Sequence, residues 1–211
     1  MADETGKPQV TYPGVYVQEV PGGSKPIPGV DTDPCAPAIQ LIVKAAAFAA
    51  HKHRDQRRKD EAASPYINHP LGLAQILISE GGVSDPVVLA AALLHDTLED
   101  TETTYDELVE EFGAAIADIV REVTDDKELP KADRKRLQIE HAPHISERAK
   151  LVKMADKISN IRDVADNGPA SWPLARRQEY FDWAAAVVAG LGNPNERLSI
   201  AFAKAMEARP K

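Results

Sequence analysis

The chain has 211 residues, of which 43% are hydrophobic and 27% charged, with a formal net charge of −8 at pH 7. This length suits one well-buried domain, and the composition excludes disorder along the whole chain. No apolar stretch approaches the roughly 20 residues of a membrane-spanning helix, and the N-terminus lacks the features of a signal peptide. Cys35, the only cysteine, excludes an internal disulfide framework. The acidic balance argues against a DNA- or RNA-binding protein, so we expect a soluble, cytoplasmic one without membrane association.

Composition divides the chain near residue 38. Residues 1–38 contain 7 of the 16 prolines and 5 of the 12 glycines. Beyond them, Ala, Leu, Ile and Val recur at three- and four-residue steps, which is typical of amphipathic helices. We therefore expect an extended arm over residues 1–37 and an all-α bundle over residues 38–211.

Helix-type periodicity and its punctuation predict the elements of the bundle. In chain order, helices are expected over 38–53, 70–79, 87–98, the stretch between Thr104 and Gly113, 114–123, 132–140, 148–163, 174–191 and 196–208. Thr104 and Glu107 form a capping-box pair at the start of one of them, and Gly113 ends that helix. The segment 87–98 is apolar almost all round, and a helix without a polar face is normally buried among others. It is therefore expected to be the central helix.

A histidine and an aspartate stand together at the end of this apolar segment, at His95 and Asp96. A buried carboxylate is costly without a partner, so Asp96 needs a cation or strong hydrogen-bond donors. His69 and Asp156 lie in similar helical contexts. Two imidazoles and two carboxylates suit Mn²⁺, Fe²⁺ or Zn²⁺ better than Ca²⁺. The alternative is a set of separate structural ion pairs, and spacing alone does not decide between the two.

Further polar residues follow this set at helical spacing. Glu99 and Asp100 each come four residues after a member of the histidine–aspartate pair, and Asn160 comes four after Asp156. If the helical turn continues, these side chains face the same site. A carboxylate beside a metal is placed to orient or deprotonate a water molecule. The competing interpretation is that Glu99 and Asp100 begin a solvated acidic loop.

The segment Lys52–Lys59 carries five basic residues in an otherwise acidic protein. It ends ten residues before His69, so it is close enough in sequence to border the same site, although such a run is often only a solvated face. Arginine binds phosphate bidentately or stacks on a base. Lys153 and Lys157 add positive charge around Asp156. Together these residues suggest metal-assisted hydrolysis of a phosphoester.

The order His69, His95-Asp96, Asp156 resembles the H…HD…D signature of HD-superfamily phosphohydrolases. Longer blocks resemble the hydrolase domain of RelA/SpoT-type alarmone enzymes, and most closely the stand-alone small alarmone hydrolases, including the metazoan SpoT homologue. These blocks are Phe48-Ala-Ala-His-Lys-His, Gln56-Arg-Arg-Lys59, Pro65-Tyr-Ile-Asn-His-Pro70, Ala91-Ala-Leu-Leu-His-Asp-Thr-Leu-Glu-Asp-Thr101, Val123-Thr-Asp-Asp-Lys127, Leu151-Val-Lys-Met-Ala-Asp-Lys157 and Gln178-Glu-Tyr-Phe-Asp-Trp183. The resemblance runs from about residue 38 to about residue 205 and implies an HD-type helical bundle.

The resemblance also implies an activity: Mn²⁺-dependent removal of the 3′-pyrophosphate of ppGpp or pppGpp, giving GDP or GTP and pyrophosphate. Another divalent metal is the alternative to Mn²⁺. Carried over by position, the metal ligands would be His69, His95, Asp96 and Asp156, the water-activating pair Glu99 and Asp100, and the substrate contacts Arg58, Lys59, Asn160, Arg176 and Tyr180. The chain has no room for a synthetase domain, so hydrolysis without synthesis is expected. Removal of the 2′-phosphate of NADPH, or hydrolysis of ppApp, would use the same site and stays open.

Residues 9–33 do not belong to that resemblance. Within them, Thr11-Tyr-Pro-Gly-Val-Tyr-Val-Gln-Glu-Val-Pro21 resembles the N-terminus of contractile tail-sheath proteins. In those proteins the arm adds a strand to a neighbouring subunit, so the resemblance implies docking to a phage tail or a similar contractile particle. The alternatives are a fusion without recruitment and a flexible proline-rich tail. A hypothesis of another class is a non-catalytic adaptor of such a particle, but an inert body has no need of the complete ligand set.

Overall fold

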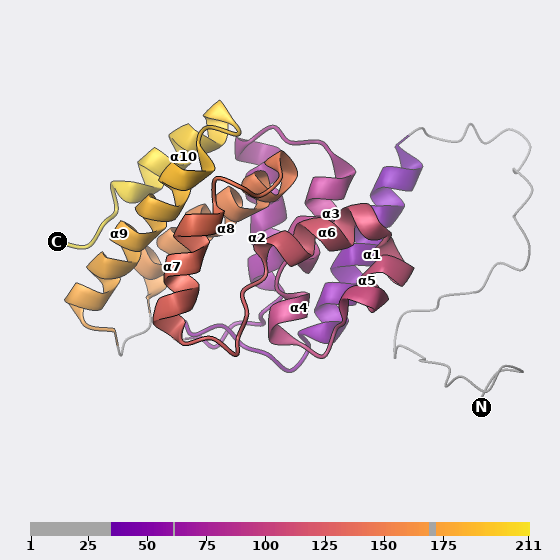
Figure 1. Ribbon diagram of the computed structural model, residues 1–211, viewed down its shortest axis with the longest axis horizontal. Helices are drawn as coiled ribbons and strands as arrows, with labels where there is room; N and C mark the ends of the chain where they lie inside the picture. The colour runs from indigo at the N-terminus through magenta and orange to yellow at the C-terminus, as the bar shows by residue number, and fades with distance from the viewer. Residues whose placement is uncertain (1–34, 61, 169–171) are drawn as a thin grey trace, which may run out of the picture. The chain divides into compact units, whose positions relative to one another are not determined.

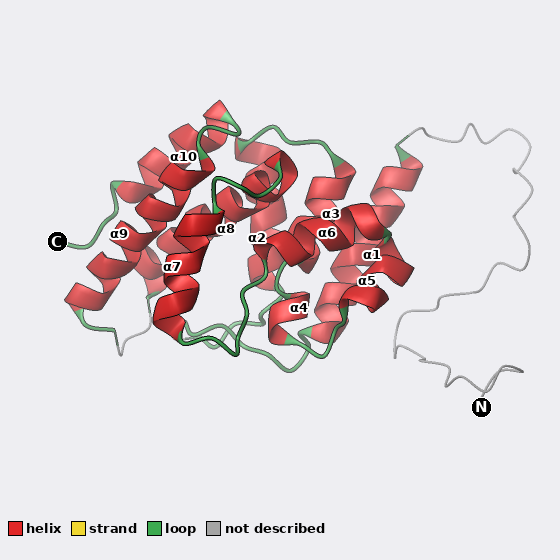
Figure 2. Cartoon of the chain, viewed as in Figure 1, coloured by secondary structure: helices red, strands yellow, loops and turns green. Residues whose placement is uncertain are grey.

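The computed structural model describes residues 35–60, 62–168 and 172–211, and the sheath-like segment 9–33 lies outside this part of the chain. Every named element in the described part is a helix (Figure 2), so the all-α prediction is confirmed. The elements are α1 Ala36–Lys52, α2 Asn68–Gln75, a π-helical turn η1 Ile76–Glu80, α3 Pro86–Leu94, α4 Thr97–Asp100, α5 Tyr105–Phe112, α6 Ala114–Val123, α7 Lys131–His141, α8 Glu147–Asn167, α9 Leu174–Leu191 and α10 Glu196–Met206. None of the described helices has the length and hydropathy needed to cross a bilayer.

Helix α3 forms the centre of the bundle, as its apolar sequence predicted. Asp85 caps its N-terminus by accepting a hydrogen bond from the Val87 N–H at 2.9 Å, and Pro86 occupies the first turn. Every residue from 88 to 94 is buried, and the helix packs against α2, α6 and α8. Each fully buried leucine contributes about 1.5–3 kcal/mol of hydrophobic stabilisation.

The continuous helix predicted over 87–98 is wrong at one point, because the chain changes direction at His95 and Asp96. Helix α3 ends at Leu94, and the short α4 begins at Thr97. The Thr97 hydroxyl donates to the Leu94 carbonyl at 2.7 Å and so satisfies a group left open by the interruption. The turn then resumes, with the Asp100 N–H donating to the Asp96 carbonyl at 2.8 Å.

Helix α8 is the second central element. It contacts α2, α3, α6, α9 and α10, and Figure 1 places it between α2 on one side and α9 and α10 on the other. Val152, Met154, Ala155, Ile158 and Ile161 bury one face of α8. Because α2, α3 and α8 meet in this way, polar residues on their facing sides are brought to one place inside the bundle.

The capping box at α5 forms by half. The Thr104 hydroxyl accepts from the Glu107 N–H at 3.2 Å, as predicted. The Glu107 carboxylate instead accepts from the ammonium group of Lys52 at 2.9 Å. Glu107 therefore links the first turn of α5 to the end of α1, and its N–H is capped by Thr104.

Candidate active site

The four predicted metal ligands come from three elements and converge. His69 lies on α2, His95 and Asp96 at the α3–α4 junction, and Asp156 on α8. Ligand atoms of His69, His95 and Asp156 lie within 4.8 Å of one another. Asp96 Oδ2 is 2.9 Å from His95 Nε2 and 3.9 Å from His69 Nε2, and Asp156 Oδ1 is 3.3 Å from His69 Nε2.

These contacts fit a divalent metal. Atoms that bind one ion at about 2.1 Å lie about 3 to 4 Å from one another, and the imidazole–carboxylate distances here, 2.9 to 3.9 Å, are close to that range. The Nδ1–H of His95 donates to the Ala92 carbonyl at 2.8 Å, so this tautomer keeps the lone pair of Nε2 available. His95 Nε2 is buried, and its nearest acceptor is the Asp96 carboxylate at 2.9 Å, a contact too poorly directed to count as a hydrogen bond. A metal ion would satisfy that nitrogen.

The charges of the site also favour a cation. Burial lowers the pKa of His95, but the carboxylates of Asp96 and Asp156 raise it more, to about 9, so without an ion the ring holds a proton that a bound metal ion would displace. Burial raises the pKa of Asp96, yet the neighbouring His95 and His69 lower it well below its usual range. The pKa of Asp156 is also held low, against burial, by Lys157 and His69. Both aspartates therefore stay ionised, which is the form that binds a cation.

The two carboxylates of α4 lie beside these ligands but differ in their surroundings. Glu99 accepts from the Asp125 N–H at 3.2 Å, and its carboxylate is 3.6 Å from the Arg134 guanidinium. Burial, followed by the charges of Asp96 and Asp125, raises the pKa of Glu99 to about 7. Such a value suits a general base at neutral pH.

Asp100 is held from two sides. Its side chain accepts from Lys127 through one oxygen, and its other oxygen lies 3.3 Å from the Tyr66 hydroxyl. Burial and the neighbouring Asp96 raise the pKa of Tyr66, so that hydroxyl stays protonated. Asp100 is therefore held in place from two sides, as a water-orienting group requires.

A cavity of about 200 Å³ lies over this cluster. It is lined by all four predicted ligands together with Glu99, Asp100, Tyr66, Arg58, Asn160 and Tyr180. Asn160 donates to Asp156 Oδ1 at 2.5 Å, and Lys157 donates to Asp156 Oδ2 at 3.1 Å. Arg58 pairs with Asp163, and its guanidinium lies 3.4 Å from the Asn160 amide oxygen.

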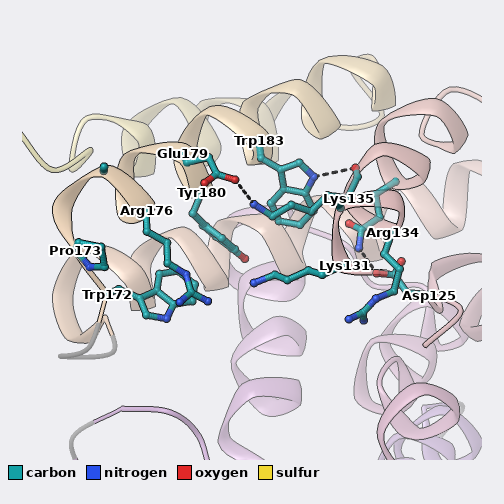
Figure 3. Close-up of a pocket in the computed structure, with 13 residues that line it drawn as sticks. Asp125, Lys131, Arg134, Lys135, Trp172, Pro173, Arg176, Glu179, Tyr180 and Trp183 are labelled. Carbon is teal, nitrogen blue, oxygen red and sulfur yellow. Dashed lines mark hydrogen bonds and ion pairs between the residues drawn. The ribbon is translucent and has the colours of Figure 1, made fainter. Parts of the chain in front are cut away.

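A second, larger cavity of about 700 Å³ adjoins the first and shares Tyr180 and Trp183 with it. Figure 3 shows Lys131 reaching across it toward Tyr180 and Trp172. Arg176 lies over the Trp172 ring at 4.2 Å. Burial, and then the positive charges of Arg176, Lys135 and Lys59, lower the pKa of Lys131. These crowded cations with aromatic walls favour a ligand that carries both anionic and planar groups.

Comparison with known proteins agrees with this geometry. A family model described as HD domain matches residues 45–192. The chain belongs to the HD-domain family. This HD domain is 60% identical over 158 residues to the guanosine-3′,5′-bis(diphosphate) 3′-pyrophosphohydrolase MESH1 of Xenopus tropicalis, covering 75% of this chain and 88% of that protein. It is 59% identical over 165 residues to the human protein of the same name, covering 78% and 92% of the two chains.

A solved structure has the same fold. It is described as a metazoan ortholog of SpoT that hydrolyzes ppGpp and plays a role in starvation responses. It superposes on this HD domain with a TM-score of 0.78 at 44% identity, covering 85% of this chain and 98% of the other. The predicted resemblance to small alarmone hydrolases of the metazoan SpoT type is therefore confirmed.

Only part of the basic run Lys52–Lys59 reaches the site of the HD domain. Arg58 lines the cavity above the ligands. Lys52 pairs with Glu107, and Arg57 donates to backbone carbonyls at 2.9 Å. Lys59 is exposed and lines neither cavity, although it lies close enough to Lys131 to help lower the pKa of that residue.

Sequence reasoning missed several residues of the site. Lys131, Arg134, Lys135 and Trp172 line the larger cavity. The helical spacing of the three cations on α7 is visible in the sequence, but nothing local places α7 against α9 and the preceding Trp172. Lys153 was expected only to add charge. It is buried, and its ammonium group donates to the Val123 carbonyl at 2.9 Å, so it secures the end of α6 next to the loop that contains Asp125.

Proposed function

We propose that this chain is an Mn²⁺-dependent hydrolase that removes pyrophosphate from the 3′ position of ppGpp. The observation that carries the proposal is the buried cluster of His69, His95 and Asp156, joined by Asp96, in an HD domain closely similar to proteins named for that reaction. The cluster supports a divalent metal, and the mixed nitrogen and oxygen donors favour Mn²⁺ over Ca²⁺.

When bound, a divalent ion supplies Lewis acidity and makes a water molecule easier to deprotonate. Glu99 accepts a proton from the attacking water, and Asp100 orients that water. The water oxygen bonds to the phosphorus that is attached to the ribose 3′ oxygen. The bond from that phosphorus to the 3′ oxygen breaks, and a proton passes to the 3′ oxygen. The products are GDP and pyrophosphate.

The remaining polar residues would bind the nucleotide. Arg58 stacks on the base, with Lys59 nearby, and Asn160 lies on the sugar-phosphate side. Arg176 and Tyr180, with Lys131 and Lys135, provide a cationic and aromatic wall for the other phosphates (Figure 3). Local cations of this kind accept a polyanion even though the whole chain is acidic.

The test is pyrophosphate release from ppGpp by the full chain supplied with Mn²⁺. Asp96→Ala should lower turnover more than about 100-fold, because even residues that only support a ligand typically account for 10–100-fold. Asp118→Ala is the matched control, since Asp118 also accepts from a tyrosine hydroxyl, at 2.8 Å, but on the distant α5–α6 pair. This control should keep wild-type turnover.

The same assay compares pppGpp, ppApp and NADPH as substrates. Turnover of NADPH without turnover of ppGpp would refute ppGpp as the substrate but would still support metal-assisted hydrolysis of a phosphoester. If no nucleotide is hydrolysed with Mn²⁺ bound, the hydrolase proposal fails and the non-catalytic adaptor hypothesis replaces it.

We further propose that residues 9–33 dock the enzyme to a contractile sheath by strand addition. The proposal is supported by the sheath-like Tyr12-Pro-Gly-Val-Tyr-Val-Gln-Glu19 segment and by the position of the HD match, which begins only at residue 45. An extended segment with alternating β-formers is well suited to adding to an exposed sheet edge.

A further inference from the structure

Tyr66 lies between α1 and α2, and its hydroxyl reaches the centre of the site. The hydroxyl donates to Asp96 Oδ2 at 2.5 Å and lies 3.3 Å from Asp100 Oδ2. Asp96 Oδ2 is also the oxygen that faces His95 Nε2 at 2.9 Å. One neutral group therefore contacts both a metal-ligand candidate and the water-orienting carboxylate.

The surroundings of Tyr66 hold its ring in one position. The ring stacks on that of the buried His53, with centroids 4.7 Å apart, and the Tyr66 N–H donates to the Gln56 carbonyl at 3.2 Å. The Gln56 side chain contacts His53 Nδ1 at 2.8 Å and donates to the Asp100 carbonyl at 2.5 Å. His53, Gln56 and Tyr66 thus form a support for Asp100 and Asp96, and support of this kind keeps a ligand in its working geometry.

A hydroxyl has one proton and donates to one acceptor at a time. The shorter contact, 2.5 Å against 3.3 Å, indicates that the hydroxyl donates mainly to Asp96. Asp100 is the second acceptor within its reach. The two carboxylates repel each other, and a donor between them lowers that repulsion. Removing the hydroxyl would leave Asp96 free to rotate away from the imidazoles.

We propose that Tyr66 is a positioning residue that holds Asp96 for metal binding and keeps Asp100 beside it. The inference rests on the proposed function in one respect, namely that the four-residue cluster binds a divalent ion. Tyr66 needs no contact with substrate in this role.

The test measures Mn²⁺ binding to the full chain by calorimetry, without nucleotide. Tyr66→Phe keeps the stacked ring and removes only the hydroxyl. We expect Mn²⁺ to bind about 10–100-fold more weakly, which is the usual range for a residue that supports a ligand. At saturating Mn²⁺, kcat for ppGpp should fall while KM changes less, because the misplaced groups act on water rather than on the nucleotide.

Tyr105→Phe is the matched control, because it removes the tyrosine–aspartate hydrogen bond to Asp118 at 2.8 Å, away from the site. It should leave the Mn²⁺ affinity unchanged. A wild-type affinity in Tyr66→Phe overturns the inference whatever happens to turnover. If Tyr66→Phe does not fold, Tyr66→Leu is measured in the same way.

The two proposals fail separately in this experiment. If the wild-type chain binds Mn²⁺ but does not hydrolyse ppGpp, the substrate is wrong, and the affinity comparison still judges Tyr66. If the wild-type chain binds neither Mn²⁺ nor another divalent ion, the metal centre is refuted, and the role of Tyr66 with it.

Discussion

Glu99 and Asp100 are adjacent in sequence but differ in what surrounds their carboxylates. The Asp100 side chain accepts from the Lys127 ammonium group, which stabilises its charge. Glu99 has only 19% of its side chain exposed and faces the negative charges of Asp96 and Asp125, with Arg134 at 3.6 Å as the partial compensation. Asp100 is therefore suited to orient water, and Glu99 to exchange a proton near neutral pH.

This difference predicts the pH dependence of hydrolysis. Burial and like charges raise the pKa of Glu99 to about 7, so below that pH the carboxyl group is protonated and cannot act as a base. We expect kcat/KM to rise with pH through an acid limb at or below pH 7, since a bound cation would favour the carboxylate. Glu99→Gln should lower kcat by about 10²–10⁴-fold and abolish that limb. A wild-type profile that is flat from pH 5 to pH 8 would contradict this assignment.

At the scale of helices, interruptions rather than long continuous segments place the site. The break between α3 and α4 turns His95 and Asp96 toward α2 and α8. A second sharp change lies between α5 and α6, where Gly113 has φ +83° and ψ 157° and serves as the end of one helix and the start of the next. This backbone conformation is essentially restricted to glycine. Helix α6 then packs on α3, so the turn supports the centre of the bundle.

Gly113→Ala should therefore destabilise the protein by about 1–3 kcal/mol, even though no atom crowds the new methyl group within 4 Å. Gly72→Ala is the matched control. Gly72 lies inside α2, also with nothing within 4 Å, so alanine should stabilise by about 0.5–1 kcal/mol. Urea denaturation of the two variants measures both values. The same sign of change in both would show that backbone conformation is not the cause.

At the scale of the whole molecule, neither the net charge nor the full length of the chain describes the candidate site. The chain has a formal net charge of −8, yet Lys131, Lys135 and Arg176 gather around one cavity and lie next to the metal-ligand cluster. The HD match begins at residue 45 and the first helix at Ala36. We therefore expect the catalytic body to be independent of the segment that resembles a sheath protein.

Deletion of residues 1–34 tests this separation. The shortened chain keeps α1 intact and should retain wild-type kcat and KM for ppGpp. If residues 9–33 dock to a sheath, co-purification with sheath protein should be lost at the same time. Equal co-purification of the full and shortened chains would remove the docking proposal, and a loss of hydrolysis would show that the arm contributes to the catalytic body.

Local sequence was sufficient for most of the helices, though not for the break at residues 95 and 96, and for the candidate ligands. The apolar spacing of 88–94, the Thr104 cap and Gly113 each act over one or two turns, so they are visible without knowledge of the fold. The histidine–aspartate pair was recognisable because a carboxylate beside an apolar helix needs a partner. The sequence was therefore enough to name the candidate ligands, but it did not predict the distances between them.

The tertiary structure decided which side chains meet. Of the five basic residues of the run 52–59, only Arg58 lines the cavity over the predicted ligands. Lys153 is buried and donates to a backbone carbonyl. Tyr66 lies between Asp96 and Asp100. The tertiary structure also brought Lys131 of α7 to Arg176 of α9. Helix formation depends on residues three and four apart, whereas these encounters depend on how α2, α3, α7, α8 and α9 pack, which is set by contacts between residues distant in sequence.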